Sequence, residues 1–112
     1  MSNVRHPELV EGWSIQKMKD YFVYIVKCSD ESYYTGVTSN LEQRINEHNY
    51  GIFKGYTSKR LPVTLVFSNR FSDVREAIRA EKQIKGWSRA KKEALIEGDF
   101  DSLVALSTSK KK

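Results

Sequence analysis

Cysteine and proline are scarce in this sequence, and long hydrophobic runs are absent. Cys28 is the single cysteine, so the chain can form neither an internal disulfide nor a cysteine-based zinc site. The longest run of apolar and aromatic side chains, Phe22–Val26, is far shorter than the ~20 residues that cross a bilayer. Because the first residues also contain no signal-peptide core, we expect a protein of the reducing cytoplasm, without a membrane partner.

Acidic side chains are outnumbered by basic ones, with 14 Asp and Glu against 19 Lys and Arg, which gives a formal net charge of +5. This surplus favours a polyanionic partner such as nucleic acid, although a solvated basic surface would give the same balance. A chain of 112 residues with 39% hydrophobic and 29% charged residues is typical of one globular domain.

Patterning along the chain predicts three parts. Residues 1–17 show neither strand alternation nor a helical apolar stripe, so we predict that they form an appended extension. The domain itself is predicted over residues 18–98. Residues 99–112 are expected to form a short helix around the apolar segment Leu103–Leu106, followed by a basic disordered tail.

Within the domain, segments rich in β-branched and aromatic residues predict three strands, and cap residues predict three helices. The first two strands form a hairpin, and Ser39 with Glu42 matches a capping box at the start of the first helix. This order predicts a small α+β domain on a three-stranded sheet with at least one antiparallel pair. The expected strands are Tyr21–Cys28, Tyr33–Val37 and Thr64–Phe71, and the expected helices end near Asn49, Lys85 and Gly98.

Ionisable side chains interrupt the apolar face of the first predicted helix. By helical spacing, one face contains two apolar and two ionisable residues: Leu41, Ile45, Arg44 and His48. Arg44 and His48 either border the core and reach solvent, which is the more common arrangement, or are held on this face for chemistry.

A carboxylate interrupts the next helix in the same way, because Glu81 continues the apolar stripe of Ala77 and Ile78. Burying a bare charge costs several kcal/mol, so Glu81 must be paired, metal-bound or at the edge of the stripe. An ion pair with one of the arginines would satisfy it. Mg²⁺ would also do so if waters and a substrate phosphate filled its other positions.

Two tyrosines, Tyr24 and Tyr34, stand in the two hairpin strands. A turn with an odd number of residues would place them on the same face of the sheet, and an even number would separate them. The sequence leaves both arrangements open.

Together these positions resemble the GIY-YIG nuclease family, and most closely its small stand-alone bacterial branch. The resemblance covers roughly residues 19–97, and its elements occur in the family's order. It differs in Phe22, which stands where the first motif opens with glycine, and in the absence of an asparagine after Asn69. The matching segments are Phe22-Val23-Tyr24, Tyr34-Thr35-Gly36, Arg44 with His48, and Glu81 within residues 80–85.

The resemblance implies a three-stranded antiparallel sheet flanked by helices, and a role for each motif residue. Tyr24 would act with an activated water, and Tyr34 would position that water or the scissile phosphate. Arg44 would contact the phosphate, His48 would assist Tyr24, and Glu81 would be the sole protein ligand of one Mg²⁺. Because catalysis requires them within reach of one phosphate, we expect all five on one exposed concave surface of the sheet.

The resemblance predicts a Mg²⁺-dependent endonuclease that hydrolyses DNA phosphodiester bonds, including those of single-stranded or structurally irregular DNA. The alternative is a non-catalytic nucleic-acid-binding module on the same fold, in which loop cations hold phosphates and an aromatic ring stacks on bases. Target choice would come from this domain, from a homodimer or from a protein partner. The residues predicted to contact nucleic acid are Lys27, Lys54, Tyr56, Lys59 and Arg60.

Overall fold

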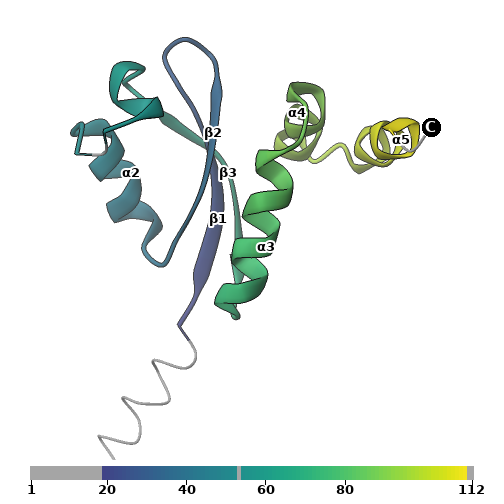
Figure 1. Ribbon diagram of the computed structural model, residues 1–112, viewed down its shortest axis with the longest axis horizontal. Coiled ribbons are helices and arrows are strands. Elements are labelled where there is room, and N and C mark those ends of the chain that lie inside the picture. Colours follow the sequence, from purple (N-terminus) through teal and green to yellow (C-terminus); the bar gives the residue numbers. More distant parts are fainter. Residues whose placement is uncertain (1–18, 53, 111–112) are drawn as a thin grey trace, which may run out of the picture.

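The computed structural model of the protein describes residues 19–52 and 54–110, and it confirms the expected α+β class (Figure 1). Within these residues, three strands form one antiparallel sheet, and no helix is long and apolar enough to cross a membrane. The elements are β1 (Tyr21–Lys27), β2 (Tyr33–Thr38), α2 (Leu41–Asn49), the 3₁₀ turn η1 (Tyr56–Lys59), β3 (Thr64–Phe71), α3 (Val74–Lys85), α4 (Arg89–Glu97) and α5 (Phe100–Lys110).

The central strand of the sheet is β1, with β2 and β3 as its two edges. Residues 23–26 of β1 are fully buried, as expected for a strand that is apolar on both faces and covered on both sides. The expected strand over Thr64–Phe71 is confirmed to the residue, because its β-branched and aromatic composition is flanked by Pro62 and a helix cap.

The register of the hairpin shows where the two motif tyrosines point. Tyr24 pairs with Gly36 and Val26 pairs with Tyr34, because the turn over residues 28–32 is odd in number. Side chains two residues apart in a strand share a face, so Tyr24 and Tyr34 project from the same face of the sheet.

The two faces of the sheet carry different helices. On one face, Val23 and Ile25 pack with Ala77 of α3 in a buried cluster. On the other face, Tyr24 belongs to a second buried cluster, against which Ile45 of α2 packs. Helices α2 and α3 therefore lie on opposite sides of the sheet, as Figure 1 shows.

Helix α2 begins one residue later than the capping-box pattern predicts. The N-cap is Asn40, whose side-chain Oδ1 accepts a hydrogen bond from the Gln43 N–H at 3.1 Å. Thr38 Oγ1 accepts from the Asn40 N–H at 3.1 Å, so the chain completes its turn after Ser39 and leaves that residue outside the helix. The predicted role of Ser39 as the cap is therefore wrong.

Helix α5 is longer than the short helix predicted around Leu103–Leu106. Asp99 accepts hydrogen bonds from the Ser102 N–H at 3.1 Å and from the Ser102 hydroxyl at 2.7 Å, which satisfies groups at the start of the helix. The helix continues to Lys110, so residues 107–110 of the tail expected to be disordered are helical. The predicted extension over residues 1–17 lies outside the described residues, and the division of the chain at residues 17 and 98 remains a proposal.

Gly36 of β2 is required by the close approach of Tyr24. A Cβ atom at position 36 would lie 2.5 Å from the Tyr24 Oη and 2.6 Å from its Cζ. We predict that Gly36→Ala lowers the free energy of unfolding by about 1–3 kcal/mol, because the ring or the strand must move.

Urea denaturation of purified variants measures this effect. Gly86→Ala is the matched control, because a Cβ there would meet its nearest heavy atom at 3.7 Å and φ is negative. Equal stabilities of the two variants would contradict the packing of Tyr24 over Gly36.

Candidate active site

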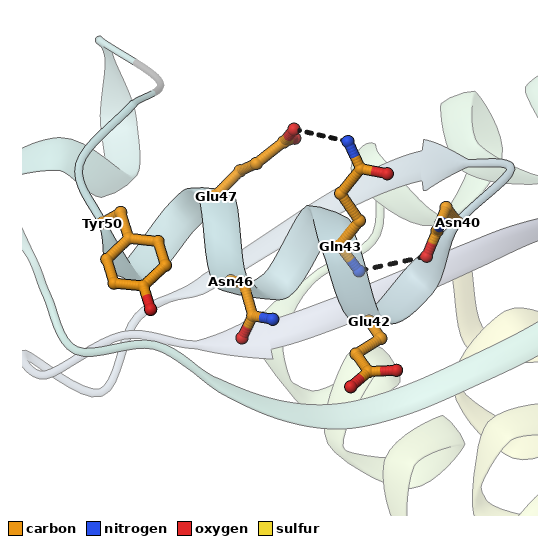
Figure 2. Close-up of a pocket in the computed structure, with 6 residues that line it drawn as sticks. All are labelled: Asn40, Glu42, Gln43, Asn46, Glu47 and Tyr50. Atoms are coloured by element: carbon orange, nitrogen blue, oxygen red, sulfur yellow. Dashed lines mark hydrogen bonds between the residues drawn. The ribbon is translucent and has the colours of Figure 1, made fainter.

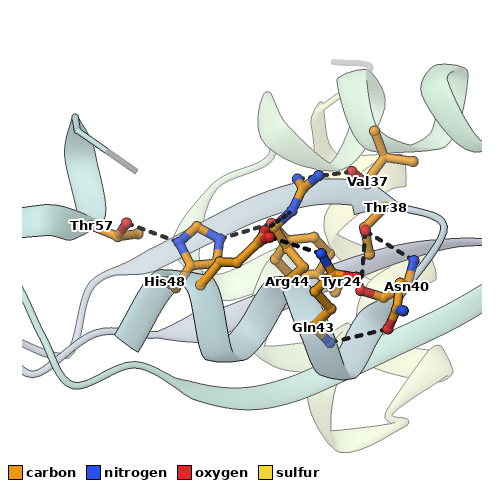
Figure 3. Close-up of polar contacts among 9 residues, drawn as sticks. Tyr24, Val37, Thr38, Asn40, Gln43, Arg44, His48 and Thr57 are labelled. Atoms are coloured by element: carbon orange, nitrogen blue, oxygen red, sulfur yellow. Dashed lines mark hydrogen bonds and ion pairs between the residues drawn. The ribbon is translucent and has the colours of Figure 1, made fainter. Parts of the chain in front are cut away.

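A chain of three buried polar side chains forms the centre of the candidate site (Figure 3). The hydroxyl of Tyr24, on β1, lies 2.9 Å from Nε2 of His48, on α2. Nδ1 of His48 lies 3.0 Å from Oγ1 of Thr57, in η1. The three residues are only 1%, 3% and 3% exposed, respectively, so these contacts form away from bulk solvent.

His48 is held inside the protein and does not reach solvent. The interpretation of His48 as a residue bordering the core is therefore wrong, because both ring nitrogens have buried partners. Burial lowers the pKa of His48, and the charge of Arg44 lowers it further, against a smaller opposing effect of Glu47. His48 is consequently a neutral imidazole at pH 7, able to accept a proton.

Tyr24 has a phenol that resists ionisation. Burial raises the pKa of Tyr24 to about 12, although a hydrogen bond from Arg44 lowers it. The neighbouring Tyr34 and Glu81 raise it, and the positive charge of Arg44 opposes them. A free phenolate at position 24 is therefore scarce at neutral pH, and any proton that leaves Tyr24 requires a nearby acceptor.

Arg44 lies between helix α2 and the edge strand β2. Its guanidinium donates to the backbone carbonyl of Val37 at 3.5 Å and lies 3.4 Å from the carboxylate of Glu47. The side chain is half-buried, so part of the cation remains accessible. A guanidinium in this position can contact a phosphate while its charge acts on the Tyr24 hydroxyl.

Tyr34 joins the buried chain to the exposed loop. Its ring makes an edge contact with His48, with the centroids 5.4 Å apart, and stacks on Tyr56 at 6.3 Å. The ammonium of Lys85 lies 6.0 Å from the centroid of the same ring. Tyr34 therefore stands at the boundary between the core of the site and its solvent-facing side.

Glu81 is paired with a lysine of its own helix. Its carboxylate lies 2.9 Å from Nζ of Lys85, and its side chain is 12% exposed while that of Lys85 is 57% exposed. Of the arrangements that the sequence left open for Glu81, the structure shows an ion pair, but with a lysine and not with an arginine. Within residues 19–52 and 54–110, no three His, Cys, Asp or Glu side chains cluster as metal ligands. This donor set suits a Mg²⁺ ion that takes most of its oxygen ligands from water and phosphate.

The expectation of one exposed concave surface with all five residues is wrong. Tyr24 and His48 are buried, and the helices that carry the two charged candidates lie on opposite sides of the sheet. Arg44 comes from α2 and Glu81 from α3, on opposite sides. Both charges nevertheless act on the Tyr24 hydroxyl. β2 is an edge strand, and Gly36, with no side chain, leaves room for the Tyr24 ring to lie over it.

Some of the residues predicted to contact nucleic acid are exposed, and others already have contacts within the protein. Lys54 and Lys59 are exposed, and Lys27 is half-buried at the end of β1. Arg60 donates to Asp30 at 3.0 Å and to the Tyr56 carbonyl at 2.6 Å, and its guanidinium lies 3.9 Å from the Tyr56 ring centroid. Arg60 thus holds the loop together as well as contributing charge.

A separate hollow of about 370 Å³ opens on α2 (Figure 2). Glu42 and Glu47 are the charged residues that line it, so it repels phosphate. None of the candidate catalytic residues lines it. Its walls are formed by Asn40, Glu42, Gln43, Asn46, Glu47 and Tyr50.

Two side chains that contact the candidate residues, Thr57 and Lys85, are absent from the sequence prediction. A threonine in a loop has no pattern that distinguishes a buried hydroxyl from an exposed one. The role of Lys85 could have been predicted from the sequence, because a glutamate and a lysine four residues apart on a helix form ion pairs.

The chain is similar to known proteins over most of its length. The family described as GIY-YIG catalytic domain matches residues 20–94. A UPF0213 protein from Staphylococcus haemolyticus is 50% identical over 80 residues, which are 71% of this chain and 98% of that protein. The UPF0213 protein YazA from Bacillus subtilis is 46% identical over 87 residues, which are 78% of this chain and 88% of YazA.

A solved structure shares the fold. The solution NMR structure of a protein from E. faecalis aligns with a TM-score of 0.53 and 34% sequence identity. The alignment covers 73% of this chain and 88% of the other.

The lowered pKa of His48 makes stability depend on pH. Below its ordinary pKa of ~6.5 the unfolded chain binds a proton at position 48 more readily than the folded chain does, so acid favours unfolding. We predict that the free energy of unfolding falls between about pH 7.5 and about pH 5.5, and that His48→Asn reduces this fall.

Urea denaturation at both pH values measures the difference. His6, the other histidine of the sequence, is present in both proteins and cancels in the comparison. The same pH slope in both proteins would show that His48 has an ordinary pKa in the folded state.

Proposed function

Because this chain belongs to the GIY-YIG catalytic-domain family, which generally consists of nucleases, we propose that it is a Mg²⁺-dependent endonuclease acting on DNA. The observation that carries the proposal is the buried contact between Tyr24 and His48 at 2.9 Å, with Arg44 beside it. A buried acid–base pair next to a fixed cation suits the attack of water on a phosphodiester.

Proton transfer in this site runs from water to His48 through Tyr24. As Tyr24 accepts a proton from the attacking water, its own hydroxyl proton moves to Nε2 of His48. The two transfers occur together, because a Tyr24 pKa of about 12 disfavours a separate phenolate. The hydroxide formed attacks phosphorus, and the bond to the leaving oxygen breaks. The proton from water is then on Tyr24, the former Tyr24 proton is on the imidazole, and the leaving oxygen departs as an oxyanion that takes a proton from solvent.

Positive charge is supplied from both sides of the sheet edge. Arg44 contacts the phosphate and stabilises the charge that grows on its oxygens. Mg²⁺, when held by Glu81, adds charge that stabilises the phosphate and the leaving oxygen. Lys85 neutralises Glu81 in the structure described, and it is exposed enough to move away.

The exposed loop before β3 is the proposed DNA contact. Lys54 and Lys59 are exposed and can bind DNA phosphates. Contacts of this kind hold the DNA without distinguishing its base sequence. Tyr56 is exposed, stacks on Tyr34 and has the Arg60 guanidinium over its ring, so an unpaired base that approaches the site meets an aromatic side chain together with a cation. This arrangement supports single-stranded or irregular DNA as the substrate.

Substitution of Glu81 separates the enzyme from a module that only binds DNA. We predict that Glu81→Gln reduces Mg²⁺-dependent cleavage of labelled DNA by at least ~10²-fold, because the charge that would hold the metal is removed. Stability should change by about 1 kcal/mol or less. Lys85 is 57% exposed and keeps its ammonium in solvent, and the neutral amide costs less to bury than the Glu81 carboxylate, which is 12% exposed.

Glu76→Gln is the matched control, because it makes the same change at an exposed position of α3. Cleavage by wild type that disappears in EDTA supports the nuclease. DNA binding without new DNA ends in any protein would instead establish the binding module.

Replacement of loop charges tests the DNA surface. We predict that the double variant Lys54→Ala, Lys59→Ala binds every DNA sequence more weakly. The slope of the logarithm of the binding constant against the logarithm of the salt concentration should fall by the equivalent of about two phosphate contacts. Arg60 is retained because it holds Asp30 and Tyr56.

Fluorescence anisotropy at several salt concentrations measures both effects. Arg75→Ala with Arg79→Ala removes two charges from an exposed part of α3 and serves as the control. If the control weakens binding and the loop variant does not, the DNA surface lies over α3.

A further inference from the structure

Thr57 is a buried hydroxyl that contacts the side of His48 facing away from Tyr24. It lies in η1, and its Oγ1 is 3.0 Å from Nδ1 of His48. A threonine hydroxyl can donate or accept. The direction of this hydrogen bond therefore depends on where the protons lie between Tyr24 and His48.

The direction follows from the groups that contact Tyr24. The positive charge of Arg44 acts on the Tyr24 oxygen. Because a guanidinium has donors only, the hydroxyl directs a lone pair, and not its proton, towards Arg44. The Tyr24 hydroxyl proton then has His48 Nε2 as its acceptor at 2.9 Å, which requires an unprotonated Nε2. A neutral imidazole must therefore carry its proton on Nδ1, and this N–H donates to Thr57 Oγ1.

We propose that Thr57 is a positioning residue that holds His48 as the Nδ1–H tautomer, with Nε2 aimed at the hydroxyl of Tyr24. The inference rests on the proposed function, because this tautomer is the one that accepts the proton of Tyr24 during hydrolysis. Thr57 keeps its partner after the transfer, since Nδ1 carries a proton in both the neutral and the charged imidazole.

The loop that carries Thr57 has its own hydrogen bonds. The Ser58 hydroxyl donates to the Gly55 carbonyl at 2.9 Å and accepts from the Gly55 N–H at 3.2 Å. Gly55 has φ of 150°, which glycine adopts more readily than other residues. Thr57 is thereby held inside the protein while Tyr56 and Lys59 stay exposed. The proposed DNA loop and the support of His48 are thus one short segment.

The tautomer of His48 can be identified in the absence of DNA cleavage. Nitrogen-15 NMR of the imidazole rings in the full chain, above the pKa of His48, identifies which ring nitrogen carries the proton. His48→Asn assigns the signal against His6, the other histidine of the sequence. We expect Nδ1–H in wild type and Thr57→Ser, and loss of this single tautomer in Thr57→Val.

Cleavage provides the second readout. Thr57→Val should reduce the cleavage rate roughly 10- to 100-fold, by analogy with the loss caused when the outer hydrogen-bond partner of a metal-binding histidine is removed. Thr57→Ser should restore most of the rate, and DNA affinity should stay the same in both variants. Thr57→Ala provides a smaller replacement if the valine variant does not fold, which its melting curve shows.

The outcomes separate the two proposals. Nδ1–H in wild type without DNA cleavage contradicts the proposed nuclease and leaves the positioning of His48 by Thr57 in place. Nε2–H in wild type overturns the inference whatever the activity. An unchanged tautomer and rate in folded Thr57→Val or Thr57→Ala overturns it as well.

Discussion

The burial of a phenol hydroxyl in the middle of the sheet is the constraint on which the rest of the site depends. A buried hydroxyl without a partner costs roughly 1–3 kcal/mol, so Tyr24 requires polar neighbours inside an otherwise apolar layer. His48 supplies the acceptor at 2.9 Å, Thr57 satisfies the other ring nitrogen, and Arg44 supplies a donor. An apolar helix face could not meet this requirement, which explains why ionisable residues interrupt the stripe of α2.

The same constraint explains why the site lies at the edge of the sheet. The Tyr24 ring extends across Gly36 of the edge strand β2, where a Cβ atom would collide with it. Its hydroxyl therefore lies where α2 and α3, on opposite sides of the sheet, both bring charge. A three-stranded sheet places its central strand one strand from each edge, so a side chain from β1 can respond to groups on both sides.

Most of the fold could be predicted because local patterns determine it. The composition of Thr64–Phe71 identified a strand to the residue, and Asp73 and Ser88 identified two helix starts. Long-range geometry was harder to predict. The shared face of the two motif tyrosines depends on turn length, and the burial of Thr57 depends on contacts with α2, which no pattern in its own loop reports.

A double-mutant cycle on DNA cleavage tests the central claim, that Tyr24 and His48 act as one proton-transfer unit. Rates are measured for wild type, Tyr24→Phe, His48→Asn and the double variant under the same Mg²⁺ and DNA concentrations. Residues that act as a unit are non-additive, so the double variant should lose about as much activity as the more impaired single variant. Losses that multiply in the double variant would contradict the account, because they would show that the two side chains act independently.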